Sequence, residues 1–357
     1  MGVAVIDFEK VRTIPLRRPE GFVPPVKRYS ISWRRPVQSI VTGYFGIQSA
    51  SKDIIDSGGF QRPLLEAFGE GKSLPASVES SFFIDSRGCY NLIYVAYWLD
   101  WGTYEKWASA RPFRGWWTAK ERQTEGVGYW REILRVSPER METLYAYPDY
   151  KVGVARCDPS EFSLVEYNGY FGAMRDRIAV SAVDRLEPPL GSEVAEARLR
   201  DTYRRRVLVH VPHNLVAIRS GQYWEKCGEE QRTDYFLNMR PLLERGTEHL
   251  RSNPRESGCL AMRLTRNLEI SGRERDESFN HAYFQSLEHL EAWSASHKTH
   301  LAIWGHAIAM MKKYGESREL RTWHEVYVLP EGGQVFEYVN CHPETGLLPY
   351  FDAECIS

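Results

Sequence analysis

A histidine stands at the start of a strongly apolar segment near residue 300. Thr299 is a suitable N-cap, so the sequence predicts a helix that begins at His300. His300 is four residues before Trp304 and therefore shares its face of the helix. A single imidazole on an apolar face suits an axial ligand of haem iron, which needs an apolar slot and one nitrogen donor. The apolar residues that define this face are Trp304, Ala307, Ile308 and Met311.

Two other interpretations of this histidine remain open. His300 could be a buried core residue that bonds to a backbone carbonyl. It could also form a metal site with His297, because residues three apart lie on one side of a helix. No further acidic or histidine ligand stands at metal-site spacing, and His297 lies outside the apolar stripe, which indicates a surface position.

A second histidine and a glutamate occupy the beginnings of two predicted strands. In the strand 324–329, alternation places His324 on one face with two valines. In the strand 142–147, Glu142 takes the corresponding place. Polar residues at matched points of otherwise apolar faces indicate a shared pocket. The alternative is that both residues mark strand ends at the surface.

Two more polar positions stand beside aromatic or turn-forming residues. Arg175 and Arg177 follow the aromatic, glycine-containing segment 169–174, so one of the two could turn inward rather than remain solvated. Ser220 ends a predicted strand just before Gly221. Its hydroxyl could contact a ligand or could simply form the turn.

Several catalytic motifs are absent from the sequence. No GxSxG surrounds Ser220, which argues against a serine hydrolase. Neither GxGxxG nor a P-loop sequence is present, so nucleotide chemistry has no support. The six cysteines form no CxxC or CxxCH pattern, which argues against a zinc ribbon and against covalently attached haem.

The sequence contains a weak internal repeat. Three pairs of similar segments occur in the same order, namely 43–48 with 217–222, 96–110 with 282–296, and 141–148 with 323–330. Three pairs of similar segments in the same order predict a duplicated unit. Each unit would alternate strands with helices confined to one face, which is an α+β, ferredoxin-like arrangement.

This repeat divides the chain into four parts. We expect an N-terminal arm (1–30), a first ferredoxin-like unit (31–150), a connecting segment that contributes to the active site (151–210) and a second unit that carries His300 (211–357). The arm is rich in proline, which favours an extended backbone lying on a surface. It would wrap over the domain or over a partner subunit; a disordered arm is the alternative.

The composition is that of an ordinary globular protein. Of the 357 residues, 43% are hydrophobic and 26% are charged, and 46 Lys and Arg balance 47 Asp and Glu. This balance indicates no basic surface for nucleic acid or an anionic membrane. No apolar run is long enough to span a membrane, and the N-terminus lacks a signal-peptide pattern. Sparse, irregular cysteines suit a reducing compartment, so we expect a cytoplasmic protein.

Several stretches of the sequence resemble one known family, the haem-containing aldoxime dehydratases. They are METLYA (141–146), GYFGAMRDR (169–177), IRSGQYW (218–224), HLEAWSASHKTHLAIW (289–304), LRTWHEVYVL (320–329) and EYVNCHPETGLLP (337–349). The set is specific, although no single stretch is. The resemblance implies a homodimer of duplicated ferredoxin-like subunits, related in fold to dye-decolourising peroxidases and chlorite dismutases. It also implies bound haem b and the conversion of an aldoxime, R–CH=N–OH, to a nitrile and water.

The resemblance implies a role for each polar residue named above. His300 corresponds to the proximal ligand of the haem iron, and His324 to the distal residue that donates and accepts a proton. Ser220 and Arg177 correspond to groups that bind the oxime hydroxyl, and Glu142 to an assisting carboxylate. The iron would act in the ferrous state, because the reaction involves no net redox change.

Three other functions remain open on the sequence alone. A peroxidase of the same fold group would need a distal Asp or Arg pair to cleave peroxide. A haem-binding sensor would use the same polar residues without turnover, and a haem-free ferredoxin-like enzyme would be colourless. The segments 1–30 and 183–206 match the family poorly, and either Arg175 or Arg177 could face the pocket.

Overall fold

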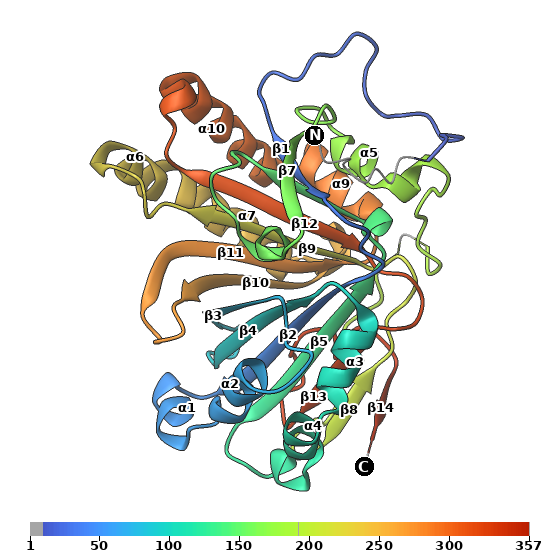
Figure 1. The fold of residues 1–357 in the computed structure, drawn as a ribbon, viewed down its shortest axis with the longest axis vertical. Coiled ribbons are helices and arrows are strands. Elements are labelled where there is room, and N and C mark those ends of the chain that lie inside the picture. The colour runs from blue at the N-terminus through green and yellow to red at the C-terminus, as the bar shows by residue number, and fades with distance from the viewer. Residues whose placement is uncertain (1–9, 192, 357) are drawn as a thin grey trace.

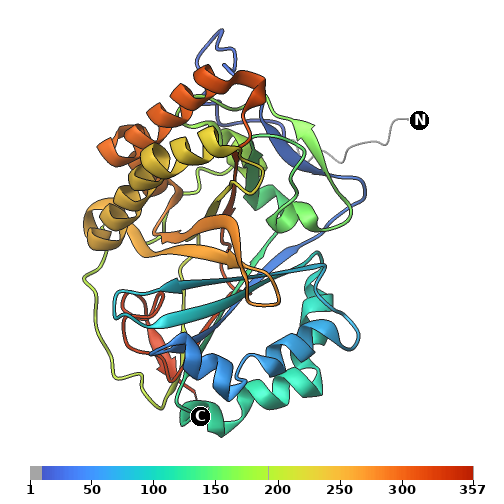
Figure 2. The same cartoon turned by 90° about the vertical axis from the view of Figure 1, so that its left-hand side faces the viewer.

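The computed structural model describes residues 10–191 and 193–356, whose strands form one curved, antiparallel sheet (Figure 1). Figure 2 shows the strands between two layers of helices, one from each half of the chain. The strand order is β14-β8-β13-β5-β2-β4-β3-β10-β11-β9-β12-β6-β1-β7. Within this order, two groups of four neighbouring strands carry the duplication.

The first ferredoxin-like unit runs strand, helices, strand, strand, helices, strand. Its strands are β2 (Ile40–Ser49), β3 (Ser77–Ile84), β4 (Tyr90–Trp98) and β5 (Gly128–Val136). Its helices are α1 (Lys52–Gly58), α2 (Arg62–Gly69), α3 (Trp101–Ser109) and α4 (Arg111–Thr118). In space the strands lie in the order β5-β2-β4-β3, so the first strand lies between the third and the fourth.

The second unit repeats this plan. Its strands are β9 (Val216–Tyr223), β10 (Cys259–Leu268), β11 (Glu274–Phe284) and β12 (Arg321–Val328). Its helices are α6 (Glu229–Asp234), α7 (Arg240–Ser252), α8 (Pro254–Ser257), α9 (Leu287–Ser296) and α10 (Lys298–Tyr314). The order β12-β9-β11-β10 matches that of the first unit, and the second strands β3 and β10 pair and join the units. The predicted duplication of a ferredoxin-like unit is confirmed.

The strand that follows each unit pairs with the other unit. β6 (Met141–Tyr145) comes after β5 in the chain but pairs with β12. β13 (Val335–Val339) comes after β12 but pairs with β5. The predicted equivalence of the Glu142 and His324 strands is therefore wrong, because β12 corresponds to β5. The two residues still share a face, because β6 and β12 are neighbours in the sheet.

A glycine covered by a tryptophan recurs in both units. Gly46 on β2 is the register partner of Trp130 on β5, and Gly221 on β9 is that of Trp323 on β12. A Cβ atom on Gly46 would lie 1.9 Å from the Trp130 ring, and one on Gly221 would lie 2.4 Å from the Trp323 ring. Only glycine leaves room for the indole in each case. Because Gly46 corresponds to Gly221, the predicted alignment of segment 43–48 with segment 217–222 is wrong by one residue.

Shorter elements complete the molecule around these units. The remaining strands are β1 (Tyr29–Trp33), β7 (Ser160–Leu164), β8 (Arg206–Val209) and β14 (Ala353–Cys355), and the remaining α-helix is α5 (Ala173–Arg177). Single 3₁₀ turns span Lys120–Gln123, Pro138–Arg140, Gly153–Arg156, Ala179–Ala182 and Gly315–Ser317, and one π-helical turn spans Tyr235–Met239. Among the described residues, no helix combines the length and apolarity needed to cross a membrane.

The described part of the N-terminal arm lies over α5 and its flanking segments. The backbone N–H groups of Thr13 and Ile14 both donate to the carbonyl of Ala182, at 2.9 Å. The N–H of Arg17 donates to the buried carboxylate of Asp176 at 3.0 Å. From residue 10 onward, the arm therefore packs against its own chain. Residues 1–9 of the predicted arm lie outside the described residues.

Candidate functional site

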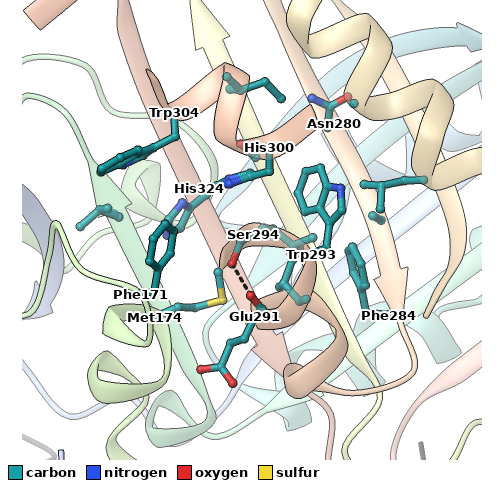
Figure 3. A pocket seen from close by; sticks show the side chains of 18 of the residues that line it. Phe171, Met174, Asn280, Phe284, Glu291, Trp293, Ser294, His300, Trp304 and His324 are labelled. Carbon is teal, nitrogen blue, oxygen red and sulfur yellow. Dashed lines mark hydrogen bonds between the residues drawn. The ribbon is translucent and has the colours of Figure 1, made fainter. Parts of the chain in front are cut away.

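A cavity of about 370 Å³ lies between the helices and the sheet of the second unit (Figure 3). One wall comes from the strands of that unit and β6, and the opposite wall comes from α7, α9 and α10. The segment 169–174 completes the lining. A cavity of this size can hold a small organic ligand. Its apolar lining includes Leu144, Met174, Ile218, Leu243, Leu250, Met262, Ala282, Phe284, Leu290, Trp293, Ile303 and Trp304.

His300 enters this cavity from the first turn of α10 (Figure 3). Its ring lies 4.8 Å from that of Trp293, centre to centre, in an edge-to-face arrangement. Its Nδ1 atom is buried and has no hydrogen-bond partner among the described residues. Burial lowers the pKa of His300, although the backbone of Ser294 opposes the shift. The imidazole is therefore held neutral, which is the form that binds a metal.

The helix that carries His300 differs from its prediction in two respects. It begins at Lys298, and its N-cap is His297, whose ring nitrogen accepts a hydrogen bond from the N–H of Thr299. Thr299 is therefore inside the helix and is not its cap. The packed face is also rotated by about one residue, because the side chains in contact with the neighbouring hydrophobic cluster are Ile303, Ala307, Met310 and Tyr314.

His297 has partners other than His300. Its ring stacks on that of His249 with centroids 3.8 Å apart, and Glu256 lies close to both histidines. The alternative in which His297 and His300 are paired metal ligands finds no support among the described residues, because His300 is not part of this cluster.

His324 enters the same cavity from β12, on the opposite wall from His300 (Figure 3). Its Nε2 lies 2.9 Å from Oε1 of Glu142 and 3.2 Å from Nη2 of Arg177. Glu142 and Arg177 also pair directly, at 2.7 Å between Oε2 and Nε. The His324 imidazole thus contacts both a cation and an anion, whereas the His300 imidazole lies mainly among apolar side chains.

The Glu142 carboxyl is charged in this arrangement. Burial by itself would raise its pKa, but the nearby Arg177 and His324 outweigh that effect and lower the pKa to about 2. Its side chain is almost completely buried and belongs to β6. Glu142 does not line the cavity itself and reaches it through His324 and Arg177.

The two arginines that the sequence could not separate have different environments. Arg177 lines the cavity and donates a second hydrogen bond to the carbonyl of Tyr167 at 2.7 Å. Arg175 points away from it, and its guanidinium binds the carboxylate of Glu291 and the carbonyl of Arg185. The structure therefore places Arg177, and not Arg175, beside His324.

Ser220 lies on the same wall as His324. The two are register partners on the neighbouring strands β9 and β12, and both line the cavity. The four side chains predicted to surround a ligand, those of His300, His324, Ser220 and Arg177, are thus brought together.

Sequence reasoning missed the contribution of α7 and one residue of β11. Gly246 allows close packing with α10, since a Cβ there would lie 3.0 Å from Ile303. Thr247 donates a hydrogen bond to Oδ1 of Asn280 at 3.0 Å, and both line the cavity. The spacing of Leu243, Gly246, Thr247 and Leu250 is that of one helix face and could have revealed this wall. No comparable local pattern marks Asn280.

The cavity fits a haem group on its own chemistry. One wall offers a neutral, half-buried imidazole, and apolar side chains form most of the surroundings. These are the features that haem requires of a protein site. His324 and Ser220 lie on the wall opposite that imidazole.

Comparison with known proteins agrees with this geometry. Residues 43–347 match the family model described as haem-containing dehydratase. The chain is 35% identical, over 94% of both chains, to an aliphatic aldoxime dehydratase of Pseudomonas chlororaphis. It is 32% identical, again over 94% of both, to a phenylacetaldoxime dehydratase of a Bacillus species.

The fold matches that of a solved member of the group. A crystal structure of an aldoxime dehydratase in complex with butyraldoxime superposes with a TM-score of 0.87 at 33% identity, covering 96% of this chain and 94% of the other. Together with the family model, which spans most of the sequence, these similarities establish that this chain belongs to the family of haem-containing dehydratases.

Proposed function

We propose that this protein converts an aldoxime to a nitrile and water, with haem held by His300 and with His324 as the proton carrier. The observation that carries the proposal is the placement of His300 and His324 on opposite walls of one cavity, with Ser220 and Arg177 beside His324. The relatives are named for this reaction on aliphatic aldoximes and on phenylacetaldoxime.

His300 would hold haem b through its neutral ring, and the apolar lining would enclose the macrocycle. When bound, ferrous haem iron supplies a coordination position for the oxime nitrogen and electron density that weakens the N–O bond. The protein's own residues supply the protons and the orientation that the reaction needs.

His324 would move the protons of the dehydration. In its protonated form it donates a proton to the oxime hydroxyl oxygen as the N–O bond breaks, so that water leaves instead of hydroxide. The neutral imidazole then accepts the proton from the oxime carbon, and the nitrile forms. One residue can perform both steps because an imidazole can both donate and accept a proton.

Glu142 and Arg177 would position His324 for this work. The Glu142 carboxylate lies 2.9 Å from Nε2 and orients the ring, while Arg177 fixes the carboxylate through their ion pair. Ser220, one strand away, would hold the oxime hydroxyl close to His324 and so shorten the proton transfer.

An absorption spectrum of the purified protein tests this proposal, recorded before and after reduction with dithionite. Butyraldoxime is then added to each form, and nitrile is measured by chromatography. We expect a Soret band that shifts on reduction and nitrile from the reduced sample. A protein that takes up no haem, or a haem protein that forms no nitrile, would overturn the proposal; dye oxidation by peroxide would then test a peroxidase.

Four further expectations are part of the same proposal. We propose a cytoplasmic homodimer that forms nitriles and consists of an arm, two units and a connecting segment with the bounds given above. The described cysteines are all free thiols, which supports a reducing compartment. Light scattering during size-exclusion chromatography measures the oligomeric state, and a monomeric mass would contradict the dimer.

A further inference from the structure

Three polar side chains form one row across the sheet wall of the cavity. Asn280 on β11 is the register partner of Ser220 on β9, and Ser220 is in turn the register partner of His324 on β12. All three line the cavity. Directly opposite side chains on one face of an antiparallel pair have Cβ atoms about 5 Å apart, within reach of each other. Ser220 therefore lies between Asn280 on one neighbouring strand and His324 on the other.

Apart from Ser220 and His324, the residues of the second unit's strands that line this wall are apolar, so the amide of Asn280 lies next to apolar side chains. Ile218, Met262 and Ala282 lie around Asn280 on the same wall. A polar group in apolar surroundings is costly to bury unless it is hydrogen-bonded. The carbonyl half of the Asn280 amide has a hydrogen-bond partner, since Oδ1 accepts the hydrogen bond from the hydroxyl of Thr247 on α7.

This single contact determines which way the amide points. Thr247 is buried and holds Oδ1 on the side of α7. The Nδ2 group, with two N–H donors, is left for the cavity, and within the described part of the chain it donates to no protein acceptor. Figure 3 shows Asn280 at the edge of the cavity that also holds His300 and His324. An oriented donor with no partner is available to a neighbouring hydroxyl when the cavity is filled.

We propose that Asn280 is a positioning residue that acts through Ser220, an inference that rests on the function proposed above. Nδ2 donates a hydrogen bond to Oγ of Ser220, and the Ser220 hydroxyl then directs its own proton to the oxime oxygen. Accepting one hydrogen bond makes a hydroxyl a stronger donor, because the bonds of a chain polarise one another. Thr247 holds the chain at its far end, so that the order is Thr247, Asn280, Ser220, substrate.

Variants of the holoenzyme test this chain of hydrogen bonds. The probe is butanone oxime, a ketoxime that keeps the nitrogen and hydroxyl but lacks the carbon-bound hydrogen that must leave. Its dissociation constant is measured from the Soret shift, independently of turnover. For Asn280→Ala we expect about five- to tenfold weaker binding, the usual worth of one hydrogen bond, and a matching loss in kcat/KM for butyraldoxime. Haem content is measured in each variant and should equal that of the wild type.

Two comparisons separate positioning from a merely structural effect. Thr247→Val should weaken ketoxime binding, whereas Thr247→Ser, which keeps the hydroxyl, should restore it. The double variant Ser220→Ala/Asn280→Ala should be no worse than Ser220→Ala alone, because Asn280 acts through that hydroxyl. Ser278→Ala is the matched control. Ser278 lies two residues from Asn280 on the same strand and bonds to Gln222 outside the cavity lining, so binding should not change.

The outcomes are distinguishable. Wild-type binding of the ketoxime by Asn280→Ala, or defects that multiply in the double variant, would overturn the role of Asn280 while leaving the dehydratase function intact. A wild-type protein that forms no nitrile would instead overturn the function itself. If the Asn280 or Ser220 variant loses haem, the comparison of Thr247→Ser with Thr247→Val still tests the hydrogen bonds, because Thr247 is the residue farthest from the substrate.

Discussion

At the scale of single residues, two histidines of one cavity have opposite surroundings. His300 lies among apolar side chains, and burial lowers its pKa, so that it stays neutral. His324 contacts Glu142 and Arg177, which surround it with opposite charges. A metal ligand must be unprotonated, whereas a proton carrier must be able to gain and lose a proton. The two environments therefore suit the two tasks that we propose for these histidines.

Replacement of His300 tests the first of these tasks. His300→Ala removes the one imidazole of the apolar wall, so we expect the purified protein to contain little or no haem. The haem-to-protein ratio is read from the pyridine haemochrome spectrum. His306→Ala is a matched control on the same helix, because His306 lies near Asp234 and does not line the cavity. Equal haem content in the two variants would contradict the assignment.

Replacement of His324 tests the second task. His324→Ala should keep haem, because the haem would be held from the other wall, and should lose turnover by about 10² to 10⁴-fold, the usual contribution of a general acid–base group. The measurement is kcat for butyraldoxime at equal haem concentration. A rate within about tenfold of the wild type would show that another group moves the protons.

At the scale of secondary-structure elements, both units depend on the same contact between strands. The indoles of Trp130 and Trp323 lie over Gly46 and Gly221. In the second unit, Gly221 and Trp323 are the register pair next to Ser220 and His324, so this packing between β9 and β12 also helps to hold those two residues in place. The positions of Ser220 and His324 thus depend in part on how β9 and β12 pack.

Gly221→Ala tests this contact. The new Cβ would lie 2.4 Å from the buried Trp323 ring, and overpacking of this kind costs about 1 to 3 kcal/mol of unfolding free energy. Urea denaturation measures the loss. Gly305→Ala is the matched control, because no atom lies within 4 Å of its added Cβ in α10, and alanine there should stabilise the helix slightly. Unchanged stability of Gly221→Ala would show that the indole can move aside.

The sequence predicts elements with local signals and misses those defined by distant partners. The start of α9 has such a local signal, because Ser286 stands just before the helix and its side chain accepts a hydrogen bond from the N–H of His289. The exchange of β6 and β13 between the units could not be predicted, because pairing partners are not encoded in a strand's own alternation. The same limit left Arg175 and Arg177 unresolved, since the path of the chain around α5 decides which arginine reaches His324.

At the scale of the whole molecule, the two units are joined by reciprocal buried hydrogen bonds. Tyr97 of β4 donates to Glu325 of β12 at 2.9 Å, and Tyr283 of β11 donates to Glu132 of β5 at 2.9 Å. Each tyrosine comes from the third strand of one unit and each glutamate from the fourth strand of the other. Glu325 follows His324 directly, so the residue that anchors the units and the residue proposed to move protons point to opposite faces of one strand.

One carboxyl of this interior is poorly compensated. Glu277 on β11 is buried, and its nearest cation, Arg275, lies 3.7 Å away and is partly exposed. Burial raises the pKa of Glu277 to about 7, and the negative charge of Glu79 acts in the same direction, while Arg275 opposes it only in part. In the unfolded chain the same group has its ordinary pKa of 4.5. Between these values the folded protein holds a proton that the unfolded chain has released.

This difference predicts how stability depends on pH. Because the folded-state pKa is raised, the free energy of unfolding falls as pH rises from about 4.5 to about 7, by roughly 3 kcal/mol if Glu277 acts alone. Glu277→Gln resembles the protonated acid at every pH, so its stability relative to the wild type should increase across this window and level off above it. Thermal unfolding of the holoenzyme at pH 5, 6, 7 and 8 measures the trend. Glu244→Gln is the control, because it removes a carboxylate from an exposed helical ion pair. Its stability should depend on pH as that of the wild type does. If the stability of Glu277→Gln also followed the wild-type pH dependence, the interior would compensate the Glu277 carboxylate fully.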